Sequence, residues 1–336
     1  MTDSRGVEER VAHIAAPLGG TIGVAARNLA SGVEVHIAAD EPYPLASCFK
    51  VAVMVEVMRR VDAGTVRLDQ RLTLTEADKS PGSTLIHCHE GLRPTVRDLL
   101  FLMITLSDNT AADVLWRLVG LDSVNETMGA LGLSSIDCFM PSREYFLIGC
   151  GAGDEWAGLA APDIVARWRE LEAGGDGAAA LRRLLDENAR LGGASFRRLY
   201  ERRWGRDESV DYEEAFIIDQ ALDNRGSPRD MADLLATIAQ GRCASGPSCR
   251  LMLEVLAQQE WRERIPAGLP AGLLVANKTG SVAGTSNDAA IVVTPNGVPM
   301  VMVIFWKELD REATRRADAA IAAVAGVLYD HLGGPA

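Results

Sequence analysis

The chain has 336 residues, of which 48% are hydrophobic, and its formal net charge at pH 7 is -12. This length is enough to bury a sizeable core in one large domain or two closely packed ones. The acidic balance argues against nucleic acid or an anionic membrane surface as a partner, because both are polyanions that would repel the protein. We therefore expect a globular protein that binds small molecules or other proteins.

Motifs for export, membrane insertion and metal binding are not evident. The first residues, MTDSRGVEERVAHIAA, are acidic where a signal peptide has basic residues, and no apolar run of about 18 or more residues follows. The six cysteines are scattered without a CxxC pair, and His87-Cys88-His89 is an HxH pattern without a third ligand in view. We expect a cytoplasmic protein with free thiols, no metal, no cofactor and no membrane partner.

The first elements predict a helix, a hairpin and a buried helix. Residues 7–18 have the spacing of an amphipathic helix, and TIGVAARNL and VEVHIAA are typical of two strands joined at the turn-forming residues 30–32. Residues 47–63 are apolar nearly all round, which is typical of a helix in the centre of a protein. Only the N-terminus of such a helix is free to act on a ligand.

The middle of the chain predicts mainly helices. Residues 96–107 and 110–119 have helical spacing with a break between them, because Asp108 and Asn109 favour caps and turns over helix interiors. Residues 149–223 contain Arg- and Glu-rich segments such as LRRLLDENARL and FRRLYERRW, which also predict helices. This part of the sequence shows no convincing repeat.

The last third returns to strands, expected at 272–278, 289–294 and 299–306, before a closing helix at about 309–331. Strands near both ends of the chain with helices between them predict an α+β fold. The expected division is a sheet subdomain formed by residues 1–46 and 265–336 and a helical subdomain formed by residues 47–264. The interface between the two is a natural place for a cleft.

Three short motifs carry the candidate chemistry: Ser47-Cys48-Phe49-Lys50 (SxxK), Ser107-Asp108-Asn109 (SDN) and Lys278-Thr279-Gly280 (KTG). Residues three apart share a helix face, so Lys50 places its amine beside the Ser47 hydroxyl. A serine hydroxyl becomes a good nucleophile when a neighbouring base takes its proton. Lysine is such a base only if its pKa falls, and burial or a second cation such as Lys278 lowers it.

The three motifs, in this order, resemble those of class A β-lactamases and related penicillin-recognising serine hydrolases. PLASCFKVAVMVEVM looks like the nucleophile helix of that family, LRPTVRDLLFLMITLSDNTAADVL like its SDN segment and LPAGLLVANKTG like the approach to its KTG strand. The resemblance covers roughly residues 7–148 and 224–332. It implies a β-lactamase-like fold, in which an antiparallel sheet is flanked by terminal helices and joined to an all-helical lobe.

The resemblance also implies the catalytic residues. Ser47 would be the nucleophile, Lys50 a general base, and Ser107 a shuttle that passes a proton to the leaving nitrogen. Glu144 and Leu147 match the ExxLN pattern that carries the family's deacylating glutamate, but Ile148 stands where the asparagine belongs. An apolar side chain does not help to hold the hydrolytic water, so Glu144 as the deacylating base is an expectation that Ile148 weakens.

A second set of residues is implied to bind the substrate: Asn109, Lys278, Thr279, Gly280 and Ser281. Asn109 would hold the substrate's amide side chain, and Lys278 with Thr279 its carboxylate. The backbone N–H groups of Ser47 and Ser281 would form the oxyanion hole. The arginine that commonly follows KTG on the next strand is missing, because the chain reads Ser286-Asn287-Asp288 there. Carboxylate recognition would then rest on Lys278 or on an arginine from elsewhere.

Compared with the family, the segment that includes residues 149–223 is long. Inserts of this length inside a compact domain are typically functional. Its aromatic and aliphatic residues, such as Trp156, Trp168 and Phe196, predict an ordered helical insertion. We expect this insertion to act as a lid over the cleft.

The leading hypothesis is a serine hydrolase that opens a β-lactam or related cyclic amide through an acyl-enzyme on Ser47. A second hypothesis is a cytoplasmic esterase or acyltransferase of a biosynthetic pathway, which the absence of an export signal and Ile148 favour. A third is a non-catalytic penicillin-binding or sensor module. Intact Ser47, Lys50, Ser107 and Lys278 argue against the third, because a binding module has no need of a proton-transfer set.

Overall fold

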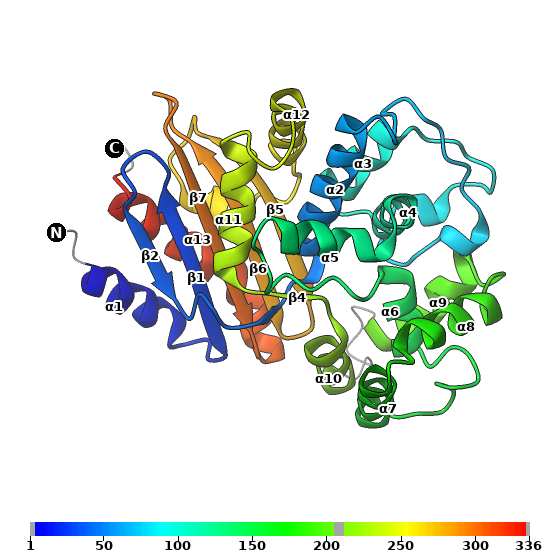
Figure 1. Ribbon diagram of the computed structural model, residues 1–336. Helices are drawn as coiled ribbons and strands as arrows, with labels where there is room; N and C mark the ends of the chain where they lie inside the picture. The colour runs from blue at the N-terminus through cyan, green and yellow to red at the C-terminus, as the bar shows by residue number, and fades with distance from the viewer. Residues whose placement is uncertain (1–3, 205–211, 334–336) are drawn as a thin grey trace.

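An antiparallel sheet forms the core of one half of the molecule (Figure 1). The computed structural model describes residues 4–204 and 212–333. Residues 1–3 and 334–336 of the predicted sheet subdomain and residues 205–211 of the predicted insertion lie outside the described residues. The five strands pair in the order β2-β1-β7-β6-β5. Their bounds are β1 (Thr21–Asn28), β2 (Glu34–Ile37), β5 (Leu274–Val282), β6 (Thr285–Val293) and β7 (Pro299–Lys307).

The two ends of the chain build this sheet together. β1 pairs with β7 along its whole length, from Thr21 opposite Lys307 to Asn28 opposite Met300. β6 and β5 extend the sheet on the other side of β7 as two hairpins. The predicted α+β fold, with strands from both ends of the chain in one antiparallel sheet, is confirmed.

Both faces of the sheet are covered, which explains the continuous apolar run of β7. Val303 and Phe305 pack into a core shared with the helical lobe, whereas Ile304 and Trp306 pack into a second core on the opposite face. Successive side chains of a strand point to opposite faces, so one strand that is apolar at every position fills two cores.

Helices from the two chain ends cover the outer face. α1 (Ser4–Ala15) and α13 (Arg311–His331) pack there, and α11 (Pro228–Ala239) crosses the inner face (Figure 1). α13 begins where the Asp310 side chain accepts a hydrogen bond from the N–H of Ala313 at 2.7 Å. Such a cap satisfies an N–H group that has no partner within the helix.

The helical lobe is built around α2 (Lys50–Asp62), which is buried from Lys50 to Met58. The predicted buried helix at 47–63 is thus confirmed, although its first turn is the 3-10 segment η1 (Ala46–Phe49). The other segments of this lobe are η2 (Glu76–Asp78), η3 (Leu85–His87), α3 (Val96–Thr105), α4 (Asn109–Val119), α5 (Leu121–Ala130) and α12 (Gly246–Leu256). A further 3-10 turn, η4 (Ile265–Gly268), leads towards β5.

A third group of helices follows α5 in the chain: α6 (Ser142–Gly149), α7 (Ala161–Gly174), α8 (Gly177–Glu187), α9 (Gly193–Trp204) and α10 (Tyr212–Leu222). They share an apolar cluster of their own, which includes Trp156, Trp168 and Phe196. The short strands β3 (Tyr43–Pro44) and β4 (Arg225–Gly226) then pair, so the chain leaving α10 lies beside the segment that leads to Ser47. Among the helices of the described ranges, none has the length and apolar character needed to cross a membrane.

Candidate active site

The first turn of the central helix presents Ser47. Ser47 lies in η1 and Lys50 is the first residue of α2. Lys50 Nζ lies 3.1 Å from Ser47 Oγ, as the spacing of the two residues predicts. Ala46, directly before the serine, has a φ of 45°, a left-handed conformation that residues other than glycine rarely adopt. The nucleophile candidate therefore stands on a strained turn, a feature typical of functional sites.

Lys50 is fully buried among polar atoms of the SDN segment. Its Nζ lies 2.7 Å from the Ser107 carbonyl oxygen, 3.2 Å from Ser107 Oγ and 2.6 Å from Asn109 Oδ1. Burial, reinforced by the charge of Lys278, lowers the pKa of Lys50 to about 7. A lysine that is partly neutral near pH 7 can take the proton of a neighbouring serine hydroxyl.

The SDN segment forms the break between α3 and α4. Ser107 has a φ of 59°, which turns its hydroxyl towards both lysines. The buried Asp108 caps α4 by accepting the N–H of Ala111 at 2.8 Å, and its other oxygen accepts the N–H groups of Thr84 and Leu85 at 2.7 and 3.0 Å. Asp108 therefore fixes the shape of the segment, while Ser107 faces the site.

Lys278 enters the site from the sheet. It is fully buried in β5, and its Nζ donates to Ser107 Oγ at 3.0 Å and to the Thr279 carbonyl at 2.7 Å. Burial lowers the pKa of Lys278 to about 8. Gly280 allows β5 to approach the nucleophile turn, because a Cβ at that position would lie 2.6 Å from the Leu45 carbonyl oxygen.

Arg264, which no sequence motif marks, brings a buried guanidinium group to the site. Its Nη1 donates to the carbonyls of Gly280 and Asn287 at 2.9 and 2.6 Å, and Nη2 donates to Ser281 Oγ at 2.6 Å. Nε pairs with Asp318 Oδ1 at 2.7 Å. A lone arginine in the loop before η4 carries no motif, so only the fold places it beside the KTG strand.

The positions where the family's arginine is missing are used for structure. Asn287 Nδ2 donates to the Pro44 carbonyl at 2.7 Å, and Asp288 Oδ2 accepts the N–H of Ile265 at 3.0 Å. Asn287 thus ties β6 to the segment before the nucleophile turn, and Asp288 ties it to the loop that carries Arg264. The cation near the KTG strand comes from that loop.

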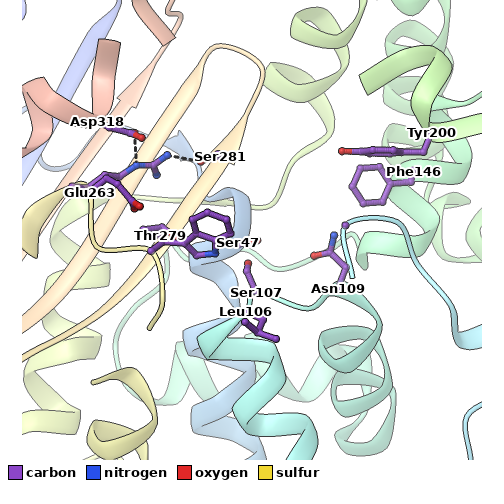
Figure 2. A pocket seen from close by; sticks show the side chains of 13 residues that line it. Ser47, Leu106, Ser107, Asn109, Phe146, Tyr200, Glu263, Thr279, Ser281 and Asp318 are labelled. Atoms are coloured by element: carbon purple, nitrogen blue, oxygen red, sulfur yellow. Dashed lines mark hydrogen bonds and ion pairs between the residues drawn. The ribbon is translucent and has the colours of Figure 1, made fainter. Parts of the chain in front are cut away.

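A cleft of about 450 Å³ joins these groups (Figure 2). It is lined by Ser47, Gly82, Leu106, Ser107, Asn109, Phe146, Tyr200, Trp261, Glu263, Arg264, Thr279, Ser281 and Asp318. Figure 2 shows Ser281 and Asp318 at one end and Phe146 with Tyr200 at the other, with Ser47 and Ser107 between them. The two aromatic rings meet edge to face, with centroids 5.1 Å apart. One end of the cleft therefore carries the Arg264–Asp318 ion pair with Glu263 nearby, and the other end is aromatic.

Glu144 has a different environment from the other candidate residues. Its buried carboxylate accepts two hydrogen bonds from Arg117 Nη2, at 2.9 and 2.7 Å, and it does not line the cleft. Nearby, Asp113 accepts the N–H groups of Ser142 and Arg143, and burial raises the pKa of Asp113 to about 6. These contacts anchor the start of α6. Glu144 as a deacylating base stays a prediction, and the ion pair with Arg117 does not favour it.

The described residues contain no group of three His, Cys, Asp or Glu side chains arranged to hold a metal ion. All six cysteines are free; Cys243 and Cys249 have their sulfur atoms 3.7 Å apart and do not form a disulfide.

The fold, with two lysines beside Ser47 and Ser107, is that of the β-lactamase-like class of serine hydrolases. The model of the Beta-lactamase enzyme family matches residues 6–332, and the chain belongs to this family. The carbapenem-hydrolyzing beta-lactamase KPC of Klebsiella oxytoca is 26% identical over 330 residues, which are 97% of this chain and 89% of that protein. A beta-lactamase of Streptomyces albus G is 26% identical over 334 residues, which are 97% and 84% of the two chains.

Solved structures agree with this assignment. A beta-lactamase from Sphaerobacter thermophilus DSM 20745 has a TM-score of 0.70 and 27% identity, and the match covers 98% of both chains. PBP-A has the same fold, with a TM-score of 0.70 and 22% identity over 97% of this chain and 95% of that one. The predicted family is thus confirmed.

Proposed function

We propose that the protein opens a β-lactam or related cyclic amide through an acyl-enzyme on Ser47. The observation that carries this proposal is the position of the Ser107 hydroxyl, which contacts both Lys50 and Lys278, while Lys50 also contacts Ser47. This chain of contacts links the nucleophile to a hydroxyl that can reach a leaving group. Such a link is what a reaction with two proton transfers requires.

In the first step, neutral Lys50 takes the Ser47 proton as Oγ attacks the carbonyl carbon of the amide. The oxygen of the tetrahedral intermediate accepts hydrogen bonds from the backbone N–H groups of Ser47 and Ser281. The C–N bond then breaks, and Ser107 gives its proton to the leaving nitrogen while it receives one from Lys50. The product of this step is an acyl-enzyme ester that, for a cyclic amide, still carries the neutral amine.

The two ends of the cleft orient the substrate. Arg264, Thr279 and Ser281 line the polar end, where a substrate carboxylate would bind to Thr279, Ser281 and the remaining N–H of Arg264, with Lys278 nearby. At the other end, Phe146 and Tyr200 form an apolar wall for the acyl group. Tyr200 belongs to α9, so this placement supports a role for the 149–223 insertion in closing the cleft over the substrate.

A second candidate function is an esterase or acyltransferase. The Arg117–Glu144 ion pair favours it, because a carboxylate held by two charge-assisted hydrogen bonds is a poor base for water. Lys50 would then activate the second nucleophile, whether water or an acceptor alcohol or amine.

The test combines nitrocefin, a fluorescent penicillin and a p-nitrophenyl ester, with turnover and intact mass followed together. Nitrocefin turnover supports the first function, and ester turnover without lactam turnover supports the second. Both functions predict a mass increase on wild-type protein that Ser47→Ala abolishes. Ser134→Ala, at an exposed serine outside the cleft lining, is the matched control. Full activity in Ser47→Ala would refute both.

A further inference from the structure

Two acidic side chains at the end of the insertion contact the walls of the active site. Asp219 lies in α10 and Asp223 directly follows its last residue, so the two are one helical turn apart. Both are buried, at 0% and 8% exposure. Asp223 Oδ2 accepts the N–H of Ala46 at 2.6 Å, and Asp219 Oδ2 accepts the N–H of Ala283, also at 2.6 Å.

The first of these N–H groups belongs to the strained turn before the nucleophile. Ala46 has a φ of 45°, which only a well-determined surrounding maintains in a residue with a Cβ. The neighbouring Leu45 N–H donates to the Asn224 carbonyl at 2.7 Å, next to Asp223. Asp223, the last residue of the insertion, and Asn224, which follows it, therefore hold two consecutive N–H groups directly before Ser47.

The second N–H group lies at the end of the KTG strand, two residues beyond Ser281. There α10 holds the turn between β5 and β6 at several points. Gln220 Nε2 donates to the Ala283 carbonyl at 3.0 Å, and the Gly284 N–H donates to the Tyr212 hydroxyl at 2.8 Å. A Cβ at Gly284 would lie 2.3 Å from the Phe216 ring, so the turn rests directly on the helix.

The two segments held by α10 are the two sides of the candidate oxyanion hole, which needs the N–H groups of Ser47 and Ser281 at a fixed separation. We propose that Asp219 and Asp223 are positioning residues, which set this separation by fastening the nucleophile turn and the end of β5 to one helix. This inference rests on the proposed acyl-enzyme function. It gives the insertion a role in the transition state in addition to its role beside the cleft.

The cost of the arrangement supports a functional reason for it. Burial raises the pKa of Asp223 to about 8, and the charge of Asp219 adds to the effect. Two acidic groups in one interior region destabilise each other, whereas apolar side chains would join the helix to the sheet without that cost. Unlike apolar side chains, the two carboxyl groups provide oxygen atoms that accept hydrogen bonds from backbone N–H groups.

The test uses Asp223→Ala and Asp219→Ala, with Asp223→Asn as the variant that keeps an acceptor oxygen. Asp186→Ala, at an exposed carboxylate on α8, is the control within the same insertion. Acylation by the fluorescent penicillin and inhibition by phenylboronic acid, which forms a tetrahedral adduct with the serine, are measured on folded protein. We expect both Ala variants to lose about 10- to 100-fold in acylation rate and a similar factor in boronate affinity, with KM changed little. Asp223→Asn should recover most of the loss.

Amide hydrogen exchange gives a second readout that does not depend on turnover. The peptide that contains Ser47 should exchange faster in Asp223→Ala, the peptide that contains Ser281 faster in Asp219→Ala, and neither in Asp186→Ala. Ala variants that melt earlier but keep wild-type acylation, boronate affinity and exchange at these peptides would overturn the proposal. If instead wild-type protein forms no adduct on Ser47, the proposed function fails, and the exchange data still decide whether the two aspartates hold the two segments.

Discussion

Lys278 and Lys50 approach the same hydroxyl group from opposite sides of the site. Their Nζ atoms lie 3.0 and 3.2 Å from Ser107 Oγ. The charge of Lys278 disfavours the charged form of Lys50, and both lysines are also buried. The pair therefore makes one lysine available as a base while the other keeps most of its charge for the substrate.

The pH dependence of acylation should have two limbs. Acylation needs neutral Lys50, whose pKa is about 7, so the rate should rise as the pH increases through 7. Carboxylate binding needs charged Lys278, whose pKa is about 8, so kcat/KM should fall as the pH increases beyond 8. Stopped-flow acylation by a fluorescent penicillin from about pH 5 to about pH 10 measures both limbs. An acylation rate that does not change with pH over this whole range would contradict the role of Lys50 as the general base.

Lys278→Gln should move the lower limb. Without the neighbouring charge the pKa of Lys50 rises, so the limb shifts to higher pH. The same variant should lower kcat/KM for a carboxylate-bearing substrate by about 10- to 100-fold, because a hydrogen bond to a charged group contributes about 1.5–3 kcal/mol. Lys278→Arg keeps the charge and should leave the limb near its wild-type position. An unshifted limb in Lys278→Gln would show that burial alone sets the pKa of Lys50.

Arg264→Ala should separate substrates by charge. Its guanidinium group lines the cleft beside Ser281, so its loss should raise KM for penicillins by about 10- to 100-fold. A neutral p-nitrophenyl ester has no carboxylate for Arg264 to bind, so its KM should change much less. Equal losses for both substrates would mean that Arg264 acts through the carbonyls of Gly280 and Asn287 and supports the strand.

Glu144→Gln should affect stability more than deacylation. Breaking a buried ion pair costs about 3–5 kcal/mol, and the lower end applies here because Arg117 is 26% exposed. Urea unfolding measures this loss, and decay of the acyl-enzyme mass measures deacylation at a temperature where the variant is folded. A variant of unchanged stability that accumulates acyl-enzyme would instead identify Glu144 as the base.

Tyr200→Ala should change the preference for the acyl group. The Tyr200 ring lines the aromatic end of the cleft with Phe146. Its removal should lower kcat/KM for a phenylacetyl-substituted substrate by about 2- to 13-fold, which corresponds to about 0.5–1.5 kcal/mol for an aromatic pair. An acetyl-substituted analogue is the comparison. The same loss for both analogues would exclude this wall as a specificity element.

The sequence was sufficient where spacing along one element decided the outcome. Ser47 and Lys50 are one turn apart on a helix, and the burial of that helix follows from its apolar residues. The terminal strands and helices were also predicted, although the strand predicted at 289–294 begins four residues later than β6, which begins at Thr285. The first residues of β6 are polar, and their burial depends on partners far along the chain, as Asn287 shows with Pro44.

Local sequence patterns did not predict the contacts between segments that are distant in the chain. Arg264 becomes part of the cleft because η4 lies next to β5, and Glu144 is paired because α6 packs on α4. Asp219 and Asp223 belong to no motif, and an Asp on a helix is usually solvated, so the sequence does not mark them as buried.

The pairing of β1 with β7 also has a consequence for synthesis. β7, the partner of β1, is synthesised near the end of the chain. A growing chain therefore carries Ser47 and its apolar helix long before Lys278 is made and the five-stranded sheet can form. Contacts between residues so distant in sequence form slowly and leave apolar surface open to aggregation. Reactivity at the serine would then report that the whole chain has been synthesised and folded.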